Sequence, residues 1–274
     1  MPSTINVNNV LPTSGDVVDV NGANVKLKTS SNSLKINSSA ADIIASQSTV
    51  IGKGAGGGVT GVASTFLGYN AGTNVSSGAA NTFIGATSGA NCTTGISNTC
   101  IGNGSGGTIT TGSTNTFIGS TVGNTFPSFT GEGNTCIGSG SNPSASNVWF
   151  EFTLGNSNVN VLRCAQTSIT SLSDARDKKE IEELPVGLDF VKGLKPVKFV
   201  WDDRDEKGKH DVKDFGFIAQ DLKKSQEDAD LADTLKLVYE SNPEKLEASY
   251  GKLVPILVKA IQELTAKVEA LEAK

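Results

Sequence analysis

Histidine and long apolar runs are scarce in this sequence. A single His among 274 residues excludes a multi-histidine metal site, and a Ser-His-Asp triad would depend on that one residue. No apolar run reaches the roughly 20 residues of a membrane helix. The first residues have neither the basic start nor the apolar core of a secretory signal. We therefore expect no metal, no cofactor and no membrane span.

Cysteine and positive charge are also in short supply. Four scattered Cys do not form the disulfide framework of a small secreted domain. The formal net charge of −5 and the pI near 5.0 argue against a protein held on nucleic acid by phosphate contacts. We therefore expect no nucleic-acid partner.

The charges that are present fall mainly in the last third of the chain. Residues 1–172 hold 5 acidic and 5 basic residues, together with 26 of the 31 Gly. Residues 173–274 hold the remaining 23 acidic and 18 basic residues. Such a change predicts two bodies with different physical chemistry.

The Gly-rich part is a repeat built on the word Asn-Thr-(Phe/Cys)-Ile-Gly. Its final Gly recurs in steps of 16, 17, 17, 17, 19 and 17 residues, and a second small residue, usually Gly, follows four positions later. The words occupy residues 81–85, 98–102, 115–119 and 134–138, with looser copies at 48–52, 64–68 and 152–155.

Each word reads as a short β segment followed by a Gly that allows a turn or a close backbone approach. One word cannot bury its own face, but stacking at a strand spacing of about 4.8 Å builds a continuous apolar ladder. The repeat therefore predicts a mainly β fold: a β-solenoid, wound singly, or a trimeric β-fibre, interleaved among three chains. A disordered Gly/Ser/Asn linker is the alternative. The fixed period, with Ile or Leu before each Gly, counts against that linker.

Two cysteines occupy the Phe position of the word. We expect Cys100 and Cys136 to be small core residues, two coils and roughly 9–10 Å apart, which is too far for a disulfide. At the end of the repeat, Trp149, Phe150 and Phe152 are expected to plug the last coil.

Residues 1–47 are less regular. Alternating residues 17–20 and 25–28 predict short strands around an Asn21-Gly22 turn. We interpret this segment as an attachment or capping piece.

Four ordered words mark the charged C-terminal part. They are Ser173-Asp174-Ala175-Arg176-Asp177-Lys178, Gly193-Leu194-Lys195-Pro196-Val197-Lys198-Phe199-Val200-Trp201, Phe215-Gly216-Phe217-Ile218-Ala219-Gln220-Asp221-Leu222 and Tyr250-Gly251-Lys252-Leu253-Val254-Pro255-Ile256-Leu257. In that order they resemble the peptidase S74 domain, the C-terminal intramolecular chaperone of phage tail fibres and tailspikes. The resemblance covers about residues 171–274.

The resemblance implies that the domain brings three chains into register, folds a β-rich trimer and then cuts itself off in cis with a Ser-Lys dyad. The pattern maps the nucleophile onto Ser173 and the base onto Lys178, with Lys179 one place off. The bond before or the bond after Ser173 is the cleavage site, and whether this copy is an active enzyme stays open.

The residues themselves set conditions on such a dyad. A Lys acts as a base only if it loses its proton near neutral pH, which burial or a neighbouring cation promotes. Residues five apart do not face each other on an α-helix, so Ser173 to Lys178 is not regular helix, or the Lys comes from another chain. The structural alternative is that Ser173 is an N-cap and Lys178 a solvated helix residue.

Other polar residues near the words are weaker candidates. Asp174 would orient the junction. Similar domains often carry a His shortly before the Gly-Phe-Ile-Ala-Gln word; here Asp214 stands there, and His210 reads better as a solvated loop residue than as a catalytic one. Gly216 predicts a tight backbone approach and Gln220 a satisfied buried amide.

Residues 251–274 predict a coiled-coil helix. Its apolar seam steps by 3, 4, 3, 4 and 3 residues through Val254, Leu257, Ile261, Leu264, Val268 and Leu271. The seam alone slightly favours two strands, whereas the resemblance favours three. The alternative is an amphipathic helix that packs on its own domain.

These observations predict attachment strands in residues 1–47, a repeat fibre in 48–172 and a chaperone in 173–274. The expected function is a phage-type tail fibre or fibre-tip subunit, made in the host cytoplasm and located in the virion. Its expected partners are two further copies in a homotrimer, other virion tail proteins and a host cell-surface receptor, a glycan or a surface protein. The insert at 125–133 is where receptor contacts are expected.

Two other functions remain as alternatives. A polysaccharide-degrading tailspike needs paired carboxylates, and residues 1–172 offer only five scattered acids. A trimeric surface adhesin with a non-cleaving trimerisation cap would share the repeat word.

Overall fold

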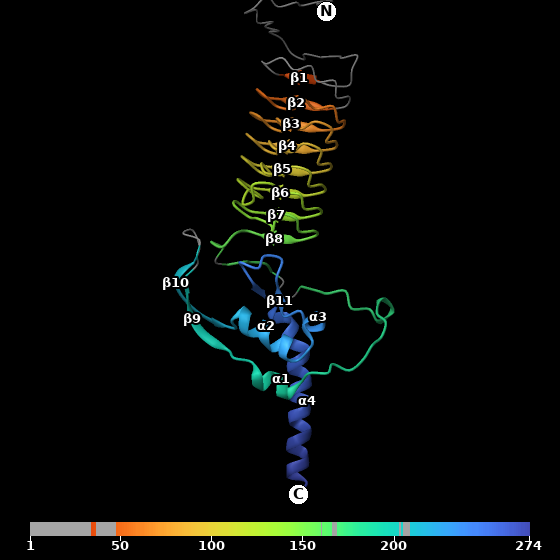
Figure 1. The fold of residues 1–274 in the computed structure, drawn as a ribbon, viewed down its shortest axis with the longest axis vertical. Helices are drawn as coiled ribbons and strands as arrows, with labels where there is room; N and C mark the ends of the chain where they lie inside the picture. Colours follow the sequence, from red (N-terminus) through yellow and green to blue (C-terminus); the bar gives the residue numbers. More distant parts are fainter. Residues whose placement is uncertain (1–33, 37–47, 160, 166–168, 203, 205–208) are drawn as a thin grey trace, which may run out of the picture.

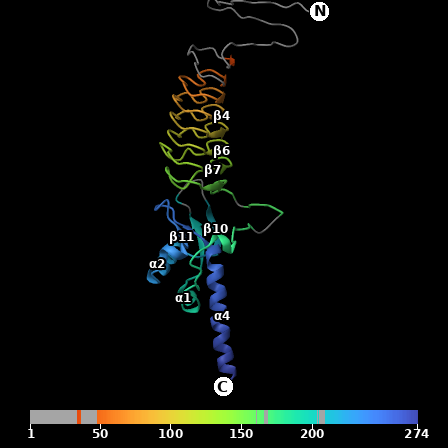
Figure 2. The same ribbon diagram turned by 90° about the vertical axis from the view of Figure 1, so that its right-hand side faces the viewer.

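The chain forms an elongated stack of strands followed by a smaller mixed domain and a protruding helix (Figures 1 and 2). The structure, a computed structural model, describes residues 34–36, 48–159, 161–165, 169–202, 204 and 209–274. The expected mainly β class is confirmed, with a parallel β-solenoid before a small α+β region. The strands expected at 17–20 and 25–28 lie outside the described residues.

The solenoid is one parallel sheet whose strands follow chain order. Neighbouring strands pair in register, so that Phe83 lies opposite Cys100 and Ile84 opposite Ile101. Each predicted word is a strand, and one strand, β1, precedes the first word. The strands are β1 (Leu34–Ile36), β2 (Thr49–Ile51), β3 (Thr65–Leu67), β4 (Thr82–Ile84), β5 (Thr99–Ile101), β6 (Thr116–Ile118), β7 (Thr135–Ile137) and β8 (Phe152–Leu154).

One column of the solenoid core is supplied by the middle residues of strands β2 to β7, and the turns between the strands add residues such as Val75, Cys92 and Ile109. Because side chains alternate along a strand, only the middle residue points inward, and Phe66, Phe83 and Phe117 are fully buried there. Cys100 and Cys136 are buried in the same column, as predicted. Desolvation by burial raises the pKa of the Cys136 thiol to about 11, so it stays protonated and behaves as a small apolar group.

A ladder of buried Asn side chains runs along one corner of the solenoid. The Asn98 amide nitrogen donates to Gly112 O (2.8 Å), and its Oδ1 accepts the backbone N–H of Asn115 (3.1 Å). Asn81, Asn115 and Asn134 repeat this arrangement, so each coil is tied both to the next and across its own corner. The ladder satisfies buried backbone groups that the three-residue strands leave unpaired.

Two Gly positions per coil are required by close contacts. Gly85 has φ of +129°, and a Cβ there would overlap the carbonyl oxygen of Gly102 in the next coil. Gly89 has φ of +57°, and a Cβ there would overlap the Phe83 ring. The predicted turn and close backbone approach after each word are therefore confirmed, and they explain why the repeat is so rich in Gly.

The expected aromatic plug is wrong. Trp149, Phe150 and Phe152 are 68%, 78% and 63% exposed. The reason is their register: Trp149 lies opposite the exposed Glu132, and Phe152 lies in the outward Thr position of the word. Phe129, from the insert at 125–133, fills the core instead and packs on Phe117 with ring centroids 5.6 Å apart.

The C-terminal domain surrounds the first half of a long helix (Figure 1). Its hydrophobic core contains Leu222, Leu237, Leu253 and Ile256. Strands β9 and β10 form one antiparallel hairpin, and β11 and β12 form another. The elements are η1 (Ala175–Asp177), α1 (Leu188–Gly193), β9 (Val197–Asp202), β10 (His210–Gly216), α2 (Ala219–Asp228), α3 (Ala232–Leu235), β11 (Val238–Tyr239), β12 (Glu247–Ala248), η2 (Tyr250–Lys252) and α4 (Leu253–Glu272).

The buried amide of this domain is Gln226, not Gln220 as expected. Gln220 is exposed in the first turn of α2. Gln226 lies four residues after Leu222 on the inner face, and its Oε1 accepts the backbone N–H of Leu237 (2.8 Å).

Helix α4 packs on its domain through a different stripe from the predicted seam. Leu253, Ile256 and Ala260 are the buried residues of the helix. The side chains of the six seam residues are between 42% and 68% exposed. Packing on its own domain therefore does not explain the seam, and the coiled coil stays a prediction.

We predict that Asn98→Ala destabilises the solenoid. The change leaves Gly112 O and Asn115 N–H buried without their partner, at a cost of about 1–3 kcal/mol for each group. The midpoint of urea unfolding of the full chain should fall accordingly. Asn103→Ala, at an exposed position outside the ladder, is the matched control and should leave the midpoint unchanged. Equal midpoints for both variants would show that the ladder is dispensable.

Candidate functional site

The structure brings the two predicted dyad residues into contact. Lys178 Nζ lies 2.6 Å from Ser173 Oγ and 3.1 Å from the Ser173 carbonyl oxygen. The contact is made within one chain. Their catalytic role stays a prediction, but the distance between nucleophile and base is the one that proton transfer requires.

A single turn of 3₁₀ helix creates this contact. The segment from Ser173 to Lys178 is extended at both ends and tightens only in η1, so it is not an α-helix, as the spacing predicted. Asp174 caps the turn, since its carboxylate accepts the backbone N–H of Arg176 (2.9 Å) and the guanidinium of the same residue (2.6 Å). Asp174 thus orients the turn that joins the dyad.

Asp174 and Arg176 also form an ion pair within the turn. The hydrogen bond from the Arg176 side chain, followed by that from its backbone N–H, holds the pKa of the Asp174 carboxyl below its usual value. The guanidinium is correspondingly matched by a carboxylate. Arg176 is therefore not an isolated cation beside Lys178.

The dyad lies on an exposed stretch of chain. Ser173 and Lys178 are both exposed, and the preceding Leu172 is 100% exposed. Because burial is what most effectively disfavours a protonated lysine, the single chain supplies the contact but not the dry surroundings.

His210 is not brought to the dyad. It begins β10, where its Nδ1 lies 3.2 Å from Asp202 Oδ1 across the hairpin. Figure 1 shows η1, the green turn, and β10 on opposite sides of α4. Asp214, which stands in the place where similar domains carry a His, accepts hydrogen bonds from Trp201 Nε1 (3.1 Å) and the Phe215 N–H. Asp214 therefore stabilises the hairpin by linking β10 to β9.

The other three words meet around Phe217. Its backbone N–H donates to the Tyr250 hydroxyl (3.0 Å), and the two rings pack edge to face. A Cβ on Gly216 would lie 2.5 Å from the same hydroxyl, which confirms the predicted tight approach. These words form the scaffold of the domain.

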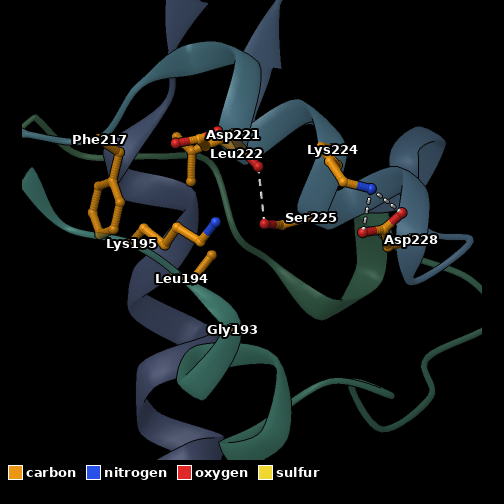
Figure 3. Close-up of a pocket in the computed structure, with 9 residues that line it drawn as sticks. All are labelled: Gly193, Leu194, Lys195, Phe217, Asp221, Leu222, Lys224, Ser225 and Asp228. Carbon is orange, nitrogen blue, oxygen red and sulfur yellow. Dashed lines mark hydrogen bonds and ion pairs between the residues drawn. The ribbon is translucent and has the colours of Figure 1, made fainter.

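A groove of about 230 Å³ lies between residues 193–195 and helix α2 (Figure 3). Figure 3 shows Lys195 reaching across it, while Lys224 pairs with Asp228 (2.9 Å) at its far end. Neither Ser173 nor Lys178 lines the groove, so it is separate from the dyad.

Comparison with protein families assigns this part of the chain. Residues 173–231 match the family model Peptidase_S74, described as the chaperone of endosialidase. The chain therefore carries a Peptidase_S74 chaperone domain. The match begins at Ser173 itself and includes two of the three scaffold words. No curated protein and no solved structure matches the chain.

Metal and membrane sites find no support in the described residues. Among them, no group of three or more His, Cys, Asp or Glu side chains is placed to bind a metal ion. None of the helices described is long and apolar enough to cross a membrane.

The chaperone domain meets the solenoid at Glu151. The Tyr239 hydroxyl, on the β11–β12 hairpin, donates to Glu151 Oε2 (3.4 Å), and Ser144 donates to the same carboxylate (2.6 Å). Glu151 occupies the ladder position of the last coil, where its N–H donates to Asn134 Oδ1 (2.9 Å). Sequence reasoning missed this junction. The contact joins residues 88 positions apart, and neither residue belongs to the four words that carry the family resemblance.

Glu247 adds a second carboxylate to the junction. Burial, and secondarily the nearby charge of Glu151, raise its pKa above the ordinary 4.5. A raised pKa means that the folded state binds the proton more tightly than the unfolded state does. Its contribution to stability is therefore greatest below about 4.5 and is lost as the pH rises through the raised pKa.

We predict that Glu247→Gln stabilises the full chain more at pH 7 than at pH 4.5, because the raised pKa means that the carboxylate formed as the pH rises is disfavoured in the folded state. The melting temperature of both proteins across this range is the measurement. Glu182→Gln, at an exposed position outside the junction, is the control for the loss of one charge. A gap in melting temperature that does not grow with pH would contradict the carboxylate repulsion.

Proposed function

We propose that this chain is a subunit of a phage-type tail fibre or fibre tip, located in the virion and used for host attachment. Its chaperone domain would drive trimerisation and folding of the solenoid and then release itself at Ser173. One observation carries the proposal: the Peptidase_S74 match begins at the residue whose hydroxyl contacts the Lys178 amine.

The proposed cleavage is an acyl transfer within the chain. The neutral Lys178 amine accepts the proton of Ser173 Oγ as that oxygen bonds to the carbonyl carbon of Leu172. The peptide nitrogen of Ser173 then leaves with the proton held by Lys178, and water hydrolyses the resulting ester. We place the break before Ser173 because attack by Oγ on its own carbonyl carbon would need a more strained ring. Positioning within one chain supplies much of the rate, and a single turnover is enough.

We further propose that assembly activates the dyad. In one chain the segment around η1 is exposed, so the burial that activates a lysine as a base is missing. The exposed seam of α4 is a surface on which three chains can associate. Burial of the η1 segment between associated chains would then disfavour the lysine's charge, so that cleavage follows trimer formation.

The solenoid supports attachment better than polysaccharide hydrolysis. Glu132 and Glu151 are the only acidic residues in the described range 48–159. Glu151 is occupied by Ser144 and Tyr239, which leaves no pair of available carboxylates. In the insert at 125–133 the Phe129 side chain is anchored in the core, while Thr125, Pro127 and Ser128 face outward. We propose that such loops contact the host glycan or surface protein.

We predict that the purified chain splits into two products and that Ser173→Ala stays at 28.3 kDa. Lys178→Met should also stay whole, because the base is lost, whereas Lys179→Met should cleave like the wild type. Intact mass spectrometry gives the result and shows whether the N-terminal product ends at Leu172 or at Ser173. A wild type that stays whole, or a Lys178→Met variant that cleaves, would overturn the proposed dyad.

We also predict that charges in the α4 seam block both assembly and cleavage. The double change Ile261→Asp and Leu264→Asp places carboxylates in the proposed contact between helices. Sedimentation should show loss of the trimer, and intact mass should show loss of the two products. Gln262→Asp, an exposed position beside the seam, is the control and should assemble and cleave normally. Cleavage by a monomeric double variant would separate catalysis from assembly.

A further inference from the structure

One face of the solenoid carries an apolar column that its own chain does not cover. The last residue of each strand from β2 to β8 is Ile or Leu and points outward, because the middle residue points inward. Leu67, Ile101, Ile137 and Leu154 are between 36% and 49% exposed. We call this set the outer column; it comprises Ile51, Leu67, Ile84, Ile101, Ile118, Ile137 and Leu154.

Strand formation alone does not require these residues to be apolar. The first residue of the same strands also points outward, and it is Thr in every strand from β2 to β7. A polar β-branched residue is therefore sufficient for the strand at an outward position. The outer column keeps an apolar side chain in all seven strands.

A second outward row shows what an unconstrained position looks like. This row lies across a left-handed corner from the sheet, where Ser97 has φ of +57°. Going along the stack, it changes from apolar to polar, charged and aromatic residues: Val62, Ala79, Ile96, Ser113, Glu132 and Trp149. The outer column is therefore under a constraint to stay apolar that the second row does not share.

The strands that carry the outer column and the helix that carries the α4 seam lie along one line. In both views α4 continues the column of strands β2 to β8 down the long axis of the molecule (Figures 1 and 2). The seam is exposed along this helix; along the sheet, four of the seven outer-column residues are exposed and the other three are half-buried. No strand from β2 to β8 contains a charged residue, so identical faces meet there without like-charge repulsion.

We propose that the outer column is the face through which copies of this chain pack against one another in the trimer. This inference rests on the proposed trimeric assembly and names the part of the solenoid that forms it. In a ring of three copies around the fibre axis, equivalent residues lie at the same height. Ile101 of one copy then faces Ile101 of the others, and each coil adds one apolar layer to the contact.

Cross-linking through a single cysteine tests this face. Ile101→Cys is made in the full chain with Cys164→Ser, which removes the exposed native thiol; the other three cysteines are buried. Because a trimer would present three equivalent thiols, a short three-armed thiol-bridging reagent should convert most chains to cross-linked species, with loss of the monomer band. Ile96→Cys in the same background is the matched control, because Ile96 is exposed in the second row; it should keep its monomer band.

Sedimentation of the same samples separates the two proposals. A trimer in which Ile101→Cys keeps its monomer band overturns this face and leaves the proposed trimer intact. A monomer for the wild-type chain overturns both. As a second variant, Ile84→Thr with Ile101→Thr and Ile118→Thr keeps β-branched residues and should show loss of the trimer. Ile96→Thr should remain trimeric, and a trimeric triple variant would contradict the inference.

Discussion

The hydrogen-bonded ladder of buried amides is the constraint on which the solenoid depends. Each Asn must reach the backbone of the next coil and of its own corner at once, so every coil has to return to the same place. Ser48 and Ser64 continue the ladder at its start, because each hydroxyl accepts the backbone N–H of the ladder residue in the next coil (3.1 Å). The near-constant 17-residue step, the stacking of equivalent core residues from coil to coil and the Gly at each close approach all follow from this return.

The same regularity creates a problem of register. Because the words are alike, pairing shifted by a whole coil keeps most ladder bonds and places Phe against Phe or Cys as before. Such near-degenerate pairings are what a folding chain has to discriminate against. The last coil differs from the others, since Glu151 replaces the Asn and contacts both Ser144 and Tyr239. A chaperone domain that holds this one coil gives the stack a defined end from which pairing can proceed.

The repeat was readable from the sequence because its physics is local. The words predicted the seven strands from β2 to β8 and the buried cysteines directly, and the Ser173–Lys178 spacing called for either a non-helical segment or a lysine from another chain. Strand β1 lacks the word, so only its pairing with β2 reveals it. The outward direction of Trp149 and Phe152 depends on coil register, and the choice of Gln226 over Gln220 depends on which face of α2 meets Leu237. The Glu151–Tyr239 contact joins distant segments with no shared pattern. These features are properties of the tertiary arrangement.

The proposed site has its Ser173–Lys178 contact in place but lacks buried surroundings, and this difference bears on whether assembly or cleavage comes first. The Asp174-capped turn sets the Ser173–Lys178 contact within a single chain, so the geometry exists before any assembly. The buried surroundings that favour the neutral form of a lysine amine do not exist at that stage, because the segment is exposed. Self-cleavage is irreversible, and a cut made before the coils are in register would remove the domain that defines the end of the stack. A dyad that is aligned early but dehydrated only between associated chains would confine the cut to correctly assembled molecules. The outer column of the solenoid and the exposed seam of α4 are the surfaces through which that association would take place, one along the repeats and one along the C-terminal helix.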